Sequence, residues 1–183
     1  MKRTRITTAA FAVLAIANLS FAAKNPIVGG KEMFPNKNII QNAVNSADHT
    51  TLVAAVKAAG LVETLEGDGP FTVFAPTNAA FQKLPSGTVD TLLKPENKAT
   101  LTKVLTYHVV AGRLSSIDLK KQIKAGNGTA MLKTVSGGTL WAMMHGSDIA
   151  LKDEKGDVAM ITQANVFQSN GVIHVINTVV LPQ

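Results

Sequence analysis

The sequence contains no cysteine among its 183 residues. This absence excludes disulfides, thiolate metal sites and a lipid-modified cysteine anchor. Aromatic residues are also scarce, with one tryptophan and one tyrosine in the whole chain. A chain without disulfides depends on its apolar core, and a domain of this length is large enough to form one. We expect one compact domain, a monomer, that is held together by packing.

The motifs of common enzyme classes are missing as well. There is no Gly-x-Ser-x-Gly nucleophile elbow, no Walker loop and no dinucleotide fingerprint. No two of the four histidines have the Glu-containing helical spacing of zinc hydrolases. The sequence therefore predicts a protein that is not an enzyme, with no cofactor and no catalytic or metal site.

The N-terminus has the pattern of a secretory signal. Lys2, Arg3 and Arg5 precede an apolar run over residues 6–19, and small residues follow as far as Ala22. The run is shorter than the roughly 20 apolar residues of a membrane-spanning helix. We predict a signal peptide over residues 1–22, export to the periplasm or the extracellular space, and no integral membrane segment after cleavage.

Positive charge is modest once the signal is removed. Loss of its three basic residues lowers the formal net charge from +6 to +3. The densest basic cluster is Lys120, Lys121 and Lys124, which has no interleaved aromatics or arginines and so does not indicate nucleic-acid binding. A solvated face is the simplest interpretation. Attachment to a membrane surface is an alternative that would need an apolar face beside the lysines.

The remaining chain divides into an arm and a domain. Residues 23–37 include two prolines and two glycines, which predicts a flexible N-terminal arm. In the domain, residues 38–183, we expect helices over 38–45, from Asp48 to Gly60 and after Pro95, with a buried strand over 71–75. Short strands follow over 139–144, 148–151, 158–165 and 172–180, the pattern of an antiparallel sheet or sandwich.

Three motifs stand out along this domain. They are the block Phe-Thr-Val-Phe-Ala-Pro-Thr-Asn over residues 71–78, the Tyr107-His108 pair, and the block Ser-Asn-Gly-Val-Ile-His-Val-Ile over residues 169–176. In this order and at this spacing they resemble the signature of the fasciclin-like domain family. Within that family the chain resembles the single-domain, secreted proteins of bacterial type. The resemblance covers residues 38–182 and implies an α+β fold, a twisted antiparallel β-wedge or sandwich with several short helices packed on one side.

Most residues of these motifs are expected to be structural. Thr77 is placed to cap a helix whose Phe81 turns back to the core. His108 and His174 lie in apolar segments, where a buried histidine with satisfied hydrogen bonds is more common than a ligand. The structural set comprises Phe74, Pro76, Thr77, Phe81, Tyr107, His108, Asn170, Gly171 and His174.

The strand over 139–144 is the best candidate for a binding surface. Strand alternation sends Trp141, Met143 and His145 to one face, and the intervening apolar residues to the other. Either the domain's own helices cover both faces, or one face is an exposed apolar patch. In the second case Trp141 and Met143 could anchor a partner, because tryptophan often dominates binding energy and methionine adapts to irregular surfaces.

The resemblance implies a secreted adhesion or interaction module without catalytic activity. Its partner would be an extracellular or cell-surface protein or a polysaccharide. In animal members an Asp-Ile element ahead of the Tyr-His pair is associated with integrin binding. Ala99 and Thr100 occupy those positions here, so integrin binding through this element is not expected.

The alternative is a periplasmic or surface protein that binds a small molecule or glycan in a cleft at the sheet edge. A deep pocket with polar groups around Trp141 or His145 would favour it.

Overall fold

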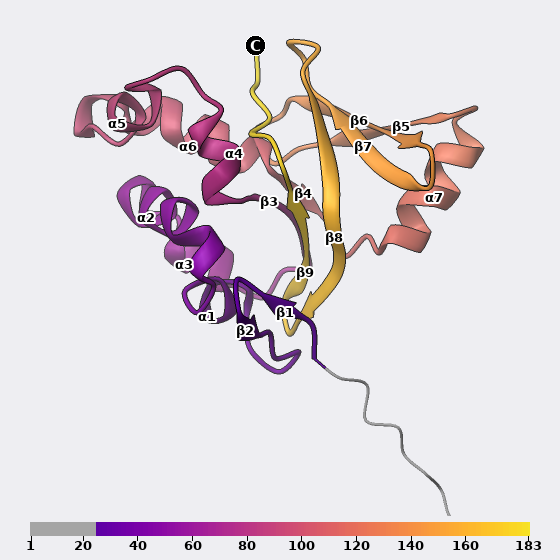
Figure 1. The fold of residues 1–183 in the computed structure, drawn as a ribbon, viewed down its shortest axis with the longest axis horizontal. Helices are drawn as coiled ribbons and strands as arrows, with labels where there is room; N and C mark the ends of the chain where they lie inside the picture. The colour runs from indigo at the N-terminus through magenta and orange to yellow at the C-terminus, as the bar shows by residue number, and fades with distance from the viewer. Residues whose placement is uncertain (1–24) are drawn as a thin grey trace, which may run out of the picture.

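The computed structural model describes residues 25–183 (Figure 1). The predicted signal peptide, residues 1–22, lies outside the described residues. The N-terminal half is mainly helical, and the C-terminal half is mainly strand. The α-helices are α1 (Ile39–Ala43), α2 (Thr50–Ala59), α3 (Val62–Glu66), α4 (Asn78–Gln82), α5 (Thr88–Leu92), α6 (Lys98–Tyr107) and α7 (Ser116–Ala125). Short 3₁₀ turns, η1 (Ala47–His49) and η2 (Pro95–Asn97), precede α2 and α6.

One seven-stranded sheet runs through the domain. Its strands are β3 (Phe71–Pro76), β4 (Val109–Ala111), β5 (Thr129–Lys133), β6 (Thr139–His145), β7 (Asp148–Lys152), β8 (Val158–Gln168) and β9 (Gly171–Ile176). They lie in the order β4-β3-β9-β8-β7-β6-β5. Every pair is antiparallel except β3 and β9, which are parallel. The predicted α+β fold is confirmed. The sheet was expected to be antiparallel, but it is mixed because β3 and β9 are parallel.

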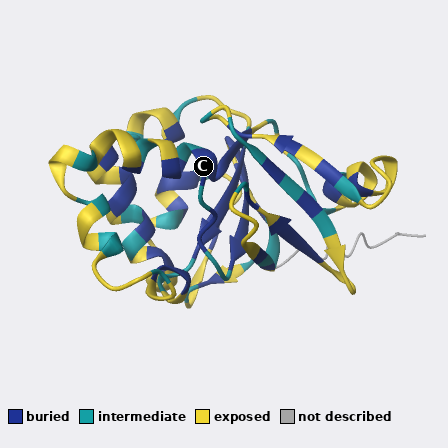
Figure 2. Cartoon of the chain, turned by 90° about the horizontal axis from the view of Figure 1, so that it is seen from above, coloured by how far each residue is buried: buried dark blue, intermediate teal, exposed yellow. Residues whose placement is uncertain are grey.

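Two apolar cores lie on opposite sides of the central strands. The first joins α1, α2, α3, α4 and α6 to β3, β4 and β9, and the second joins α7 to the strands from β5 to β8. Figure 1 shows α1 to α6 grouped at one end of the molecule and α7 at the other. Figure 2 shows the central strands buried, with the buried faces of the helices turned toward them. The short helices are therefore not all on one side, because α7 covers the strand-rich end.

Local sequence signals explain where the helices begin and end. Asn38 and Gln41 form a capping box at the start of α1, and Ser115 and Asp118 form another at the start of α7. Helix α2 ends where the sequence predicts, with Gly60 as a left-handed C-cap that has a φ of 73°. Asp48, where the sequence predicts the start of this helix, lies instead in η1, and α2 has no side-chain cap.

The segment expected to be a flexible arm differs from that expectation where the structure describes it. Residues 25–37 include the two-stranded hairpin of β1 (Ile27–Val28) and β2 (Lys31–Glu32). Val28 and Met33 are buried in the helical core. Composition rich in proline and glycine indicates the turns of this segment, but the two apolar side chains and hydrogen bonds from Ala47 to Gly29 and from Gln163 to Ile27 dock it on the domain.

Candidate functional site

The two motif blocks lie side by side at the centre of the sheet. The parallel pairing of β3 and β9 places Phe71 opposite Gly171 and Phe74 opposite His174. The Phe74 and His174 rings stack with centroids 5.7 Å apart. Both side chains have no exposed surface. The blocks thus form the interior of the fold and not a cleft.

Each of the two motif histidines has hydrogen-bond partners at both ring nitrogens. His108 Nδ1 lies 2.8 Å from the Val104 carbonyl, and its Nε2 accepts from the Val180 amide at 3.2 Å. His174 Nε2 lies 2.8 Å from the Leu114 carbonyl, and its Nδ1 accepts from the Asn165 amide at 3.3 Å. Burial lowers the pKa of His174, and it lowers the pKa of His108 to about 4 although the Val104 carbonyl opposes it. These are neutral structural histidines, with no nitrogen left for a ligand.

The other motif residues also hold the fold together. Thr77 Oγ1 accepts from the Ala80 amide at 3.2 Å as the cap of α4, while Pro76 and Phe81 are buried. Asn170 accepts from the Ile39 amide at 3.0 Å and donates to the carbonyls of Leu65 and Gly67.

The candidate binding strand, β6, has one buried and one accessible face. Leu140 and Ala142 have no exposed surface and pack in the second core. Trp141 and Met143 are half-buried on the opposite face, and His145 is exposed at the end of the strand. The domain's helices therefore do not cover both faces of β6.

Strand pairing places further apolar side chains beside Trp141. Met131 of β5 and Lys152 of β7 are its direct neighbours, and Lys152 in turn pairs with Val158. The next row runs from Met143 through Ala150 to Met160. We call this surface the outer face, and its side chains are Met131, Trp141, Met143, Lys152, Val158 and Met160.

The outer face is mainly apolar and carries the Lys152 ammonium, while Asp148 lies opposite His145 at its edge. Met131 is 72% exposed and Val158 is 47% exposed. The Lys152 ammonium lies 5.8 Å from the centroid of the Trp141 ring, in cation–π range. Sequence alternation identified Trp141, Met143 and His145 on this face, but Met131, Val158 and Met160 join it only through tertiary strand pairing.

The described residues contain no arrangement that suits metal chemistry. Over residues 25–183, no three histidine or carboxylate side chains gather as metal ligands would. No helix within this range is long and apolar enough to cross a membrane. An apolar cavity lies between α2 and β3, and neither Trp141 nor His145 lines it.

Comparison with known proteins places this geometry in a family. The Fasciclin domain family matches residues 47–182. Protein sll1483 of Synechocystis is 42% identical over 173 residues, which cover 92% of this chain and 87% of the relative. The cell surface glycolipoprotein MPB83 of Mycobacterium bovis is 32% identical over 188 residues, covering 97% of this chain and 78% of the relative.

The fold is similar to that of a solved structure. The FAS1 domain pair from the insect cell adhesion molecule fasciclin I aligns with a TM-score of 0.71 at 18% identity. The alignment covers 80% of this chain and 51% of the insect chain. Because the family match and the sequence relatives both extend over most of the described domain, the chain belongs to the fasciclin domain family.

Proposed function

We propose that this protein is an exported, non-enzymatic adhesion or interaction module. Its outer face would bind an extracellular or cell-surface protein or a polysaccharide. The observation that carries the proposal is the row formed by Met131, Trp141 and Lys152, in which a largely exposed methionine and a lysine flank the only tryptophan of the chain.

The chemistry of the outer face suits a macromolecular surface. An exposed sheet face offers no enclosed site, but tryptophan and methionine provide apolar contact area that adapts to the partner. Lys152, with Lys133 exposed on the same strand as Met131, adds positive charge. Because complementary charge speeds association and selects partners, an anionic polysaccharide or an acidic protein surface is the favoured partner.

The relatives support the same reading. One is named as a cell surface glycolipoprotein, and the structural neighbour is a cell adhesion molecule.

The basic and apolar N-terminal residues predict export, with the mature chain beginning at Ala23. Mass spectrometry of the exported protein tests this, because an intact residue 1–22 segment on the exported chain would contradict the predicted cleavage.

Binding of the mature chain, residues 23–183, tests the proposal. We would measure its binding to intact cells, to neutral and anionic polysaccharides and to extracellular matrix proteins, over a salt series. Trp141→Ala should weaken saturable binding by about tenfold or more, as truncation of a central tryptophan commonly does. Ile117→Ala, at a 62% exposed position on α7, is the matched control and should bind as the unchanged protein does.

Two outcomes would contradict the proposal. Equal binding by a folded Trp141→Ala protein would remove the outer face as the binding site. Failure of the unchanged chain to bind any of these targets would argue against adhesion.

Binding of a small molecule is a second candidate function. The cavity between the helices and the sheet favours it, although this cavity lies away from the sheet edge that the sequence suggested.

A further inference from the structure

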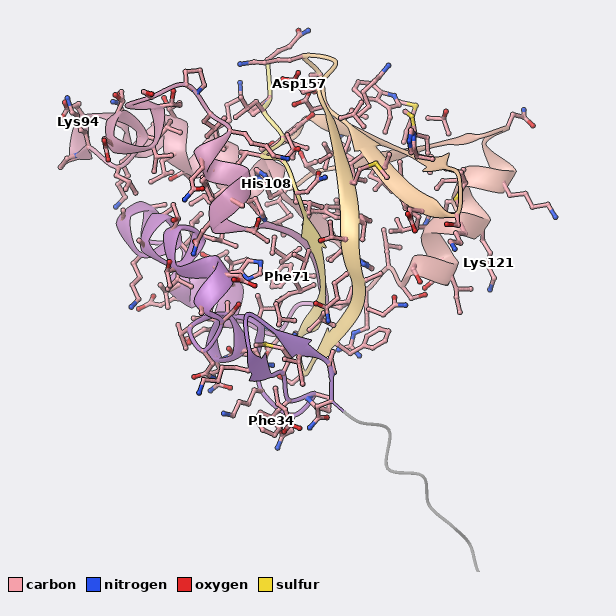
Figure 3. The ribbon with its side chains drawn as sticks, in the orientation of Figure 1. Phe34, Phe71, Lys94, His108, Lys121 and Asp157 are labelled. Carbon is pink, nitrogen blue, oxygen red and sulfur yellow. The ribbon has the colours of Figure 1, made fainter. Side chains whose placement is uncertain are left out.

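The methionines of the described domain gather at its strand-rich end. Residues 25–183 contain five of them, and four lie on β5, β6 and β8: Met131, Met143, Met144 and Met160. The fifth, Met33, is 2% exposed in the first core. In Figure 3 most of the yellow sulfur atoms accordingly lie at the strand-rich end, away from the helices α1 to α6. Because the chain has no cysteine, methionine thioethers are its only sulfur groups.

Met131 is the methionine most open to solvent in residues 25–183. Its side chain is 72% exposed, against 39% for Met144, while Met143 and Met160 are half-buried. Strand β5 is the last strand of the described sheet, so no further strand of that sheet shields Met131 on its outer side. A dissolved reagent therefore reaches this sulfur more readily than the sulfur of the other four.

Met131 also lies beside the only tryptophan of the chain. Met131 and Trp141 are directly opposite in the β5–β6 pair, where facing Cβ atoms are about 4.5–5.5 Å apart. Both side chains belong to the outer face, and thioether sulfur makes favourable contacts with aromatic rings. A change in the chemistry of the Met131 sulfur therefore changes the surroundings of Trp141.

Hydrogen peroxide provides a balanced reaction at an accessible thioether. A lone pair of the sulfur attacks one peroxide oxygen, the O–O bond breaks, and that oxygen stays on the sulfur as a sulfoxide. The other oxygen leaves as water, so the sulfur loses two electrons and the peroxide gains them. Methionine sulfoxide reductases reverse the reaction, with the two electrons supplied by thiols and the oxygen released as water.

The position of Met131 allows this reaction to change the surface without disturbing the core. A sulfoxide is polar, and water solvates it at a side chain that is largely exposed. The same change at Met33 would place a polar group in the first core without hydrogen-bond partners. Oxidation of Met131 thus replaces an apolar contact beside Trp141 by a polar one and leaves both cores intact.

We propose that Met131 is a reversible oxidation site, at which a peroxide converts the centre of the outer face from an apolar to a polar surface. The oxidation itself and its effect on Trp141 do not depend on the proposed function. The consequence for binding rests on the proposed function, because an apolar contact area that becomes polar holds a partner less tightly.

Treatment of the mature chain with limiting hydrogen peroxide tests the proposal. Peptide mass spectrometry should show Met131 oxidised faster than Met144, and about tenfold or more faster than Met33. The fluorescence of Trp141 should change with the rate constant of Met131 oxidation, and no second tryptophan contributes to it. Methionine sulfoxide reductases, one for each sulfoxide epimer, should restore both the mass and the emission.

Met144 provides the matched control. It is also exposed and lies on β6, but strand alternation directs it to the face opposite Trp141. Met144→Leu should therefore keep the change in emission, and Met131→Leu should lose it. Both positions are exposed, so both variants should fold.

Binding to immobilised heparin, an anionic polysaccharide, tests the consequence for the outer face. Oxidation should weaken heparin binding by the Met144→Leu protein about fivefold or more and leave binding by the Met131→Leu protein unchanged. If the untreated chain does not bind heparin, that result counts against an anionic polysaccharide as the partner. The mass and emission measurements then decide the oxidation site alone.

Three results would overturn the proposal. The first is oxidation of Met33 or Met144 as fast as that of Met131. The second is an emission that stays constant while Met131 is oxidised, or that still changes in the Met131→Leu protein. The third is equal heparin binding before and after oxidation of Met131 in a chain that binds heparin, which would remove the effect on the outer face.

Discussion

The Tyr107 hydroxyl donates a 2.6 Å hydrogen bond to the Thr139 carbonyl and so connects the end of α6 to the start of β6. The same oxygen accepts from the Glu154 amide at 3.1 Å. Burial raises the pKa of Tyr107 to about 12, with the nearby carboxylates of Glu154 and Asp153 acting in the same direction and the Glu154 amide opposing them. The hydroxyl therefore keeps the proton that it donates throughout the neutral pH range.

Tyr107→Phe should lower the free energy of unfolding by about 1–3 kcal/mol, because it leaves the Thr139 carbonyl and the Glu154 amide without their partner. Urea denaturation measures the change. Ser147→Ala, in the exposed turn after β6, is the control and should shift the free energy of unfolding by less than about 0.5 kcal/mol. A Tyr107→Phe protein as stable as this control would show that the hydroxyl contributes no net stability.

The stability of the domain should fall as pH decreases from about 6.5 to 4. His108 has a folded-state pKa of about 4, below the ordinary value of 6.5, so the unfolded chain binds a proton first. Its contribution is complete above pH 6.5, is lost as pH falls toward the folded pKa, and amounts to at most about 3 kcal/mol. Burial lowers the pKa of His49 and His174 as well, which acts in the same direction.

Urea denaturation between pH 4 and 8, with NMR titration of the imidazole rings, measures this effect. The His108 ring should remain neutral down to about pH 4. His145→Gln, at an exposed position, should leave the stability profile unchanged. Titration of His108 near pH 6.5 in the folded protein would contradict the prediction.

Much of the fold could be predicted from sequence because the signals are local. Leu101, Val104 and Leu105 lie on one face of α6 and are buried, as their helical spacing indicates. The short C-terminal strands follow from their turns and alternation. Helix α7 was missed although Ser115 and Asp118 form a capping box, because the helix has only two buried side chains, Leu119 and Ile123.

The parts that were not predicted depend on contacts between distant segments. Strands β3 and β9 are mostly apolar and buried on both faces, so they carry no alternation from which to read a register or direction. The outer face is partly local, since alternation in β6 places Trp141 with Met143. Its neighbours Met131 and Val158 come from other strands.

The two asparagines at the ends of β9 should respond differently to replacement by aspartate. Asn170 uses its amide NH₂ to donate to the carbonyls of Leu65 and Gly67, at 2.8 and 2.9 Å. Asn170→Asp would place a carboxylate against two carbonyls in a buried site, so we expect a loss of more than about 3 kcal/mol. Failure of this variant to fold would agree with the prediction.

Asn177→Asp is the matched comparison, because Asn177 Oδ1 accepts from the Met160 amide at 2.9 Å and from Thr178 Oγ1 at 3.1 Å. A carboxylate can make both bonds, so stability should change by less than about 1 kcal/mol at neutral pH. Thermal and urea denaturation of the two variants measures the contrast. Similar losses in both would show that the donor groups of Asn170 are not what the site requires.

Gly171 should tolerate no side chain, because β3 lies directly against its Cα. A Cβ at this position would lie 2.2 Å from the Phe71 carbonyl oxygen and 3.0 Å from Ile39 Cδ1. The carbonyl belongs to the strand paired with β9, so relief of the clash would require the parallel pair to separate. We expect Gly171→Ala to cost about 3 kcal/mol or more, at the upper end of overpacking effects.

Gly67→Ala provides the control, since Gly67 has a φ of −61° and its nearest potential contact, the Thr64 carbonyl oxygen, is 3.3 Å away. Any contact strain there is partly offset by the smaller conformational freedom of alanine in the unfolded chain, so the change should stay within about 1 kcal/mol. Urea denaturation and amide hydrogen exchange in β3 and β9 compare the two variants. Equal stability with equal protection would mean that the two strands can move apart at little cost, and that the close parallel pair does not depend on glycine.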